Sequence, residues 1–109
     1  MSWFVARLRD DVDPGLQTGA LVHRFEWLSV ALAASGEDAA ALALFAAAGP
    51  GGTAAAPEVY LTPGCEPFLR LLLEGLEPRA CEPPAPERLV RLGGGAGWRD
   101  GFLARRQPA

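Results

Sequence analysis

The chain has 109 residues, of which 50% are hydrophobic and 21% are charged, a composition typical of one small globular domain rather than of a disordered chain or a fibre. Ten basic and 13 acidic side chains give a formal net charge of −3, without the concentrated basic face that duplex DNA or RNA binding needs, so we expect no nucleic-acid partner. The chain contains no lysine, which excludes Schiff-base chemistry and a P-loop lysine.

Two cysteines are too few for a disulfide-rich secreted domain, and residues 1–7 lack the pattern of a signal peptide, so we expect a cytoplasmic protein. The most apolar stretch, residues 28–48, is divided by a polar segment at residues 35–38, and neither part reaches the ~20 apolar residues of a membrane-spanning helix. We therefore expect no membrane partner. Residues 1–106 are predicted to form one compact domain, followed by a disordered tail at residues 107–109.

The first half of the chain predicts a strand followed by two helices. Residues 3–8 carry apolar side chains on both alternating faces, which is typical of a buried strand, and an aspartate-rich turn follows at residues 9–15. Over residues 16–34 apolar positions recur at helical spacing, and this stripe consists of Leu21, Phe25, Leu28 and Leu32. Residues 38–48 predict a second helix, with a short strand at residues 41–45 as the alternative, because periodicity does not separate the two in an apolar run.

The second half predicts alternating strands and helices. These are a strand at residues 58–62, a helix with the apolar face Phe68, Leu69, Leu72, Leu73 and Leu76, a short strand at 79–81, an extended proline-rich stretch at 83–86, a strand at 88–92, and a last short helix with Trp98 and Phe102. This alternation favours an α/β fold, a small three- to four-stranded mixed or mostly parallel sheet with about four helices packed on it, with a mixed α+β fold as the alternative.

Both cysteines, Cys65 and Cys81, are followed by Glu-Pro. If residues 59–81 form a strand–helix–strand crossover between neighbouring strands, both thiols lie at the carboxyl edge of the sheet, where open α/β sheets bind their ligands. The groups that would complete a soft-metal site or a thiol-redox site there are Glu66, Glu82 and His23. The alternative is that both cysteines are packing residues, which is favoured because zinc motifs usually contain closely spaced ligand pairs.

Two other motifs have simpler interpretations. The glycine run at residues 93–97 stands between a strand and a helix, but Trp98 occupies the place where a dinucleotide-binding fingerprint needs its final glycine, so we interpret the run as a flexible connection. Asp10, Asp11 and Asp13 are too few for a calcium loop and predict a solvated turn. We therefore expect no cofactor, and the sequence indicates no catalytic residue and no particular small-molecule ligand.

The long helix at residues 16–34 has a second apolar face, which a small core does not need. Its residues are His23, Arg24, Trp27, Val30, Ala31 and Ala34. This face either packs on the next helix or forms a subunit or partner surface, in which Trp and Arg are enriched. We therefore expect a small non-enzymatic domain that acts by protein–protein association, as a homodimer or an accessory subunit. The alternative function is a thiol-redox or metal-binding activity at Cys65 and Cys81.

Overall fold

A computed structural model describes residues 2–37, 42–48 and 54–94. Its strands are β1 (Trp3–Arg7), β2 (Ala43–Ala48), β3 (Ala54–Leu61), β4 (Pro78–Cys81) and β5 (Leu89–Gly94). Its helices are α1 (Pro14–Ala34), the single-turn α2 (Leu69–Leu72), and the 3-10 helices η2 (Pro63–Phe68) and η3 (Pro86–Arg88). Within these residues, no helix, α1 included, combines the length and apolarity needed to cross a membrane.

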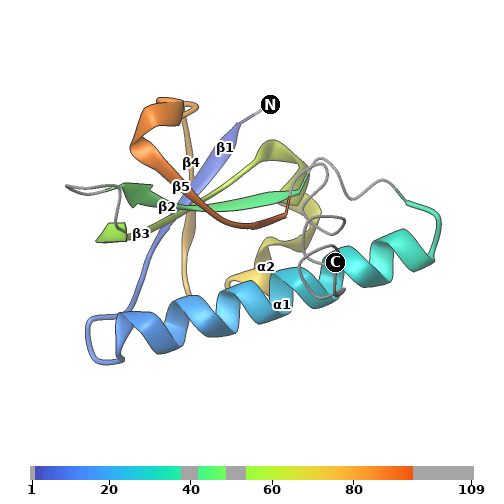
Figure 1. Ribbon diagram of the computed structural model, residues 1–109, viewed down its shortest axis with the longest axis horizontal. Helices are drawn as coiled ribbons and strands as arrows, with labels where there is room; N and C mark the ends of the chain where they lie inside the picture. The colour runs from blue at the N-terminus through green and yellow to red at the C-terminus, as the bar shows by residue number, and fades with distance from the viewer. Residues whose placement is uncertain (1, 38–41, 49–53, 95–109) are drawn as a thin grey trace, which may run out of the picture.

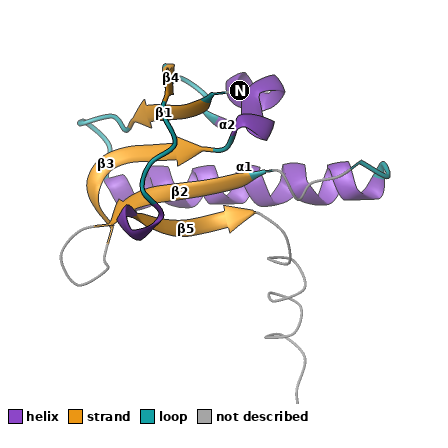
Figure 2. Cartoon of the chain, turned by 90° about the horizontal axis from the view of Figure 1, so that it is seen from above, coloured by secondary structure: helices purple, strands orange, loops and turns teal. Residues whose placement is uncertain are grey.

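The five strands form one antiparallel sheet in the order β4-β1-β3-β2-β5. α1 joins β1 to β2 and leaves a gap that β3 fills, while η2 and α2 join β3 to β4 and leave a gap that β1 fills. Both helices lie on one side of the sheet (Figure 1), and α1 runs along it when it is seen from above (Figure 2). The order β4-β1-β3-β2 is the double split β-α-β arrangement of ferredoxin-like proteins, and β5 is added beside β2.

The predicted fold class, a three- to four-stranded mixed or mostly parallel sheet with about four helices, is wrong. The described part of the chain has five strands, all paired antiparallel, and two α-helices. Alternating strands and helices indicate parallel neighbours only when each connection joins adjacent strands. Here the connections through α1 and through η2 and α2 each join two strands that have another strand between them. The α+β class, which was the alternative, is compatible with this sheet.

The individual strand predictions and the long helix are confirmed. β1, β3, β4 and β5 occupy the strands predicted at residues 3–8, 58–62, 79–81 and 88–92, and α1 occupies the helix predicted at residues 16–34. The predicted last helix with Trp98 and Phe102 and the predicted tail at residues 107–109 lie outside the described residues.

The helix predicted over residues 38–48 is wrong where the structure describes this segment, because β2 occupies Ala43–Ala48. β2 lies between β3 and β5 and places Leu44 and Ala46 in the core. A strand with two neighbours satisfies its backbone hydrogen bonds in the sheet, so an alanine-rich run with high helix propensity still forms a strand there. The alternative strand at residues 41–45 is therefore closer to the structure.

The helix predicted around Phe68 to Leu76 is reduced to η2 and one turn of α2. Pro67 lies inside η2 and has no N–H to donate, and Gly75, with φ of +82°, lies in the left-handed region just after the turn. The predicted apolar face is nevertheless buried: Leu72 and Leu73 lie in the core, and Phe68, Leu69 and Leu76 pack against it.

α1 begins at a capped turn. Asp13 Oδ2 accepts the backbone N–H of Leu16 at 3.1 Å, and Gln17 holds the preceding turn by accepting the N–H of Arg9 at 2.7 Å. Arg9 also pairs with Asp11 at 2.7 Å, and this hydrogen bond lowers the pKa of the Asp11 carboxyl. These aspartates therefore serve an exposed turn, as predicted.

The sheet has an inner face, toward α1, and an outer face. Phe4, Ala6, Leu44, Val59 and Leu61 belong to the inner face and meet Leu21, Phe25 and Leu28 of α1 in one core cluster. Side chains alternate between the two faces along each strand, so the residues between these core positions point to the outer face. Paired across neighbouring strands, they form one row: Arg79, Val5, Tyr60, Phe45 and Arg91. The inner face holds the core, and among the described residues the outer face is covered only in part, by the segment between β4 and β5 that contains η3.

Candidate functional site

The two cysteines lie at the same edge of the sheet, but β3, which leads to Cys65, and β4, which ends at Cys81, are not neighbouring strands. Leu61, at the end of β3, pairs with Phe4, and Cys81, at the end of β4, pairs with Trp3, so both strands end where β1 begins. The predicted adjacency of the two strands is wrong, because β1 lies between β3 and β4. At about 4.8 Å between adjacent strands, this insertion doubles their separation to roughly 9.6 Å, beyond the reach of a disulfide without backbone movement.

Cys65 is a packing residue. It is fully buried in η2, its Sγ lies 3.6 Å from Thr62 Oγ1, and it donates a long hydrogen bond to the carbonyl of Ala43 at 3.9 Å. Burial raises the pKa of the Cys65 thiol, and the hydrogen bonds from its neighbours offset this only in part. A thiol with a raised pKa is poorly suited to the thiol-redox alternative, because a reactive thiol needs a lowered pKa.

Cys81 is half-buried at the end of β4, and its pKa is also raised. Desolvation is the largest cause; the guanidinium of Arg79 opposes it, and the carboxylates of Glu58 and Glu82 add to it. Glu66 and Glu82 are exposed, and His23 is exposed on α1. The described residues contain no group of three or more His, Cys, Asp or Glu side chains that could hold a metal ion. The structure therefore does not bring the predicted thiol and metal site together.

Alkylation with iodoacetamide should modify Cys81 first. Cys65 is buried, so its modification should be limited by the rate of local or global unfolding. Because the thiolate is the nucleophile and the pKa of Cys81 is raised, the pH at which its rate reaches half of the maximum should lie above that of free cysteine. Peptide mass analysis over a pH series measures both rates, and guanidinium should equalise them. Fast labelling of Cys65 in the folded protein at neutral pH would contradict the buried position.

The outer side of α1 carries an apolar stripe that the core does not use. We call the six residues Leu16, Ala20, His23, Trp27, Val30 and Ala34 the outer stripe; all six are exposed. The exposed fractions of its large side chains are 71% for Leu16, 63% for Trp27 and 41% for Val30. These positions lie opposite Leu21, Phe25, Leu28 and Leu32 around the helix, so packing of α1 on the sheet leaves the outer stripe exposed.

Arg24 and Ala31 belong to the predicted surface but lie at its border. Arg24 is half-buried, donates from Nε to the carbonyl of Leu72 at 3.0 Å, and places Nη1 3.9 Å from the carboxylate of Glu74. Arg24 therefore links α1 to α2 within the chain. The surface predicted from the sequence did not include Leu16 and Ala20. Ala20 lies three residues before His23 and Leu16 four residues before Ala20, so both continue the same stripe toward the start of α1.

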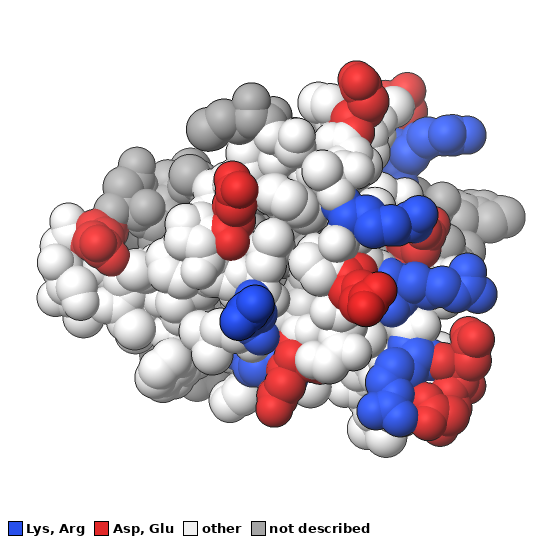
Figure 3. Space-filling view, turned by 180° about the vertical axis from the view of Figure 1, so that it is seen from behind, with Lys and Arg blue, Asp and Glu red and all other residues white. Residues whose placement is uncertain are grey.

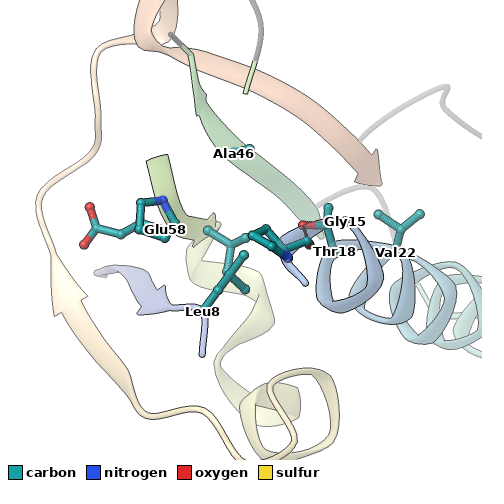
Figure 4. A pocket seen from close by; sticks show the side chains of 10 residues that line it. Leu8, Gly15, Thr18, Val22, Ala46 and Glu58 are labelled. Carbon is teal, nitrogen blue, oxygen red and sulfur yellow. Dashed lines mark hydrogen bonds between the residues drawn. The ribbon is translucent and has the colours of Figure 1, made fainter. Parts of the chain in front are cut away.

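A cleft of about 710 Å³ lies between the first turns of α1 and the sheet (Figure 4). Its ten lining residues are Leu8, Pro14, Gly15, Thr18, Gly19, Val22, Ala46, Pro57, Glu58 and Val59. Two of these have polar side chains. Thr18 donates its hydroxyl to the carbonyl of Pro14 at 2.8 Å, and Glu58 points away from α1 toward Arg79, 3.8 Å distant. The cleft is thus apolar and offers no acid–base pair among these residues.

The outer face of the sheet carries an aromatic cluster that is already partnered within the chain. The rings of Trp3 and Phe45 are 5.6 Å apart, and the guanidinium of Arg91 lies 5.5 Å from the Phe45 ring centre, a cation–π distance. The segment between β4 and β5 borders a pocket of about 530 Å³ over this face, next to Tyr60 and Arg88. The side of the molecule seen from behind in Figure 3 carries arginine side chains beside acidic ones, so neither sign of charge dominates it.

No family model, no curated protein and no solved structure matches this chain. Its function must therefore be inferred from its own residues.

Proposed function

We propose that this chain is a non-catalytic association domain that forms a homodimer through the outer stripe of α1. The observation that carries the proposal is the exposed Trp27, 63% accessible on the side of α1 that the core does not use. Tryptophan is the residue type most often responsible for binding energy at protein interfaces, and large apolar patches on a folded domain mark interaction sites.

The composition of the outer stripe favours contact with an apolar protein surface. None of its six residues is Asp, Glu, Lys or Arg, and His23 is its one polar member. Covering Leu16, Trp27 and Val30 removes apolar surface from water at about 25 cal/mol per Å². Two identical stripes that meet would also bring no like charges together.

The alternative function, a thiol or metal activity at Cys65 and Cys81, has less support. β1 separates the strands that lead to the two cysteines, and burial raises the pKa of both thiols. A metal site needs ligands that converge, and thiol chemistry needs a stabilised thiolate. The separation of the two strands does not favour the first, and the raised pKa values do not favour the second.

Trp27→Glu should weaken self-association at least about tenfold, because a carboxylate in an apolar interface is desolvated without a partner. Sedimentation equilibrium over a wide protein concentration range measures the association constant. Ala33→Glu is the matched control, since it adds the same charge to an exposed position of α1 outside the outer stripe. We expect the control to associate like the wild type and both variants to keep the wild-type circular dichroism spectrum.

A wild-type protein that remains monomeric at every accessible concentration would refute the homodimer. Equal association of Trp27→Glu and Ala33→Glu would place the interface elsewhere on the molecule.

A further inference from the structure

The six residues of the outer stripe follow one another at spacings of four, three, four, three and four. This is the spacing of a coiled-coil seam, in which one helix packs along another over its whole length. Large and small residues occupy the seam in a defined order: Leu16, Trp27 and Val30 are large, and Ala20 and Ala34 are small. That order predicts how two copies of α1 fit together.

Parallel packing of two copies about a twofold axis sets each residue against itself. Trp27 then meets the second Trp27, whereas Ala20 and Ala34 face alanines and leave space. Crowding at one layer and voids at two others both destabilise an interface. The parallel arrangement therefore fits this sequence poorly.

Antiparallel packing with full overlap of the stripe centres the twofold axis at position 25, midway between Leu16 and Ala34. Leu16 then faces Ala34 of the second copy, and Val30 faces Ala20. Trp27 faces His23, so two aromatic rings share a layer on each side of the axis. Each large aliphatic side chain meets a small one, which is how well-packed layers interdigitate.

Exposed area sets the expected strength of such a contact. With about 150–250 Å² per aromatic side chain, the exposed parts of two Trp27 residues alone would bury roughly 200–300 Å². With Leu16 and Val30 the total reaches roughly 600–800 Å², below the ~1,200 Å² of standard stable complexes. The pairing is therefore expected to be weak and to depend on protein concentration.

We infer that two copies of this chain pack α1 against α1 in antiparallel orientation, with Leu16 facing Ala34, Ala20 facing Val30 and His23 facing Trp27. This inference rests on the proposed homodimer and adds its orientation and register. The absence of charged side chains in the seam lets identical faces meet without repulsion, and the alternation of large and small residues selects the antiparallel register over the parallel one.

Thiol crosslinking distinguishes the two orientations. In a Cys81→Ser background, Leu16→Cys and Ala34→Cys are prepared as separate proteins, and a short thiol-to-thiol crosslinker is added to each alone and to their mixture. Positions 16 and 34 lie about 27 Å apart along a helix, so the antiparallel register places a thiol at 16 beside one at 34 only in the mixed dimer. Parallel packing links each variant to itself and not to the other.

We expect a crosslinked dimer in the mixture and none above the Cys81→Ser background in either variant alone. The pair Ala20→Cys and Val30→Cys repeats the test with other side chains removed. Links within each single variant would overturn the antiparallel register while leaving self-association through the outer stripe intact. No links in either pair, for a protein that sediments as a dimer, would overturn both the register and the stripe as the interface, and a monomeric wild type would refute the homodimer itself.

Discussion

Phe25→Ala should lower the free energy of unfolding by about 3–5 kcal/mol, as large-to-small substitutions of buried aromatic residues do. Phe25 is 1% exposed and is the largest fully buried side chain of the described residues. Its ring reaches from α1 to Gly93 of β5, where a Cβ would lie 3.9 Å from the ring, so this neighbour has no side chain that could fill the space. A small domain has only about 5–15 kcal/mol of stability in total.

Urea denaturation followed by circular dichroism at one fixed protein concentration measures this loss. Ala33→Ser is the control on the same helix, because Ala33 is exposed and lies outside the outer stripe, and it should cost less than about 1 kcal/mol. If Phe25→Ala fails to fold, Phe25→Leu keeps most of the volume and should cost less, about 1–2 kcal/mol. Equal stabilities of Phe25→Ala and Ala33→Ser would contradict the packing of α1 on the sheet.

Leu72→Ala is expected to lower the free energy of unfolding by about 2–5 kcal/mol, although α2 is only one turn long. Leu72 is 0% exposed and belongs to the core cluster that α1 and the sheet share. Its backbone carbonyl also accepts the hydrogen bond from Arg24, so the residue stands where α2 contacts α1. The side chain, not the length of the helix, determines the cost.

Leu71→Ala provides the control because Leu71 is the preceding residue of the same turn and is 46% exposed. The two variants remove the same atoms and have the same helix propensity, so the difference between their unfolding free energies reports burial alone. A thermal melt of each, at equal concentration, gives the same order. A Leu71→Ala variant as unstable as Leu72→Ala would show that the inward face of α2 is wrongly placed.

The local sequence pattern was sufficient to predict α1 and the strands β1, β3, β4 and β5. The spacing of Leu21, Phe25 and Leu28 defines the buried side of a helix because side chains three and four residues apart share one face. The same periodicity exposes Trp27 and Val30, so the candidate interface could be predicted before the fold. Both conclusions depend only on residues within one turn or two of each other.

Tertiary structure decided the features that depend on residues far apart in the chain. Residues 43–48 are apolar throughout and have no period, so only their place between β3 and β5 makes them a strand. The insertion of β1 between β3 and β4 separates the strands that lead to Cys65 and Cys81. Arg24 contacts Leu72 and Glu74, which lie about 50 residues later in the chain. Helix periodicity arises from neighbours along the chain, whereas strand order is chosen by which distant segments bury the most apolar surface together, and that choice leaves no local signal in the sequence.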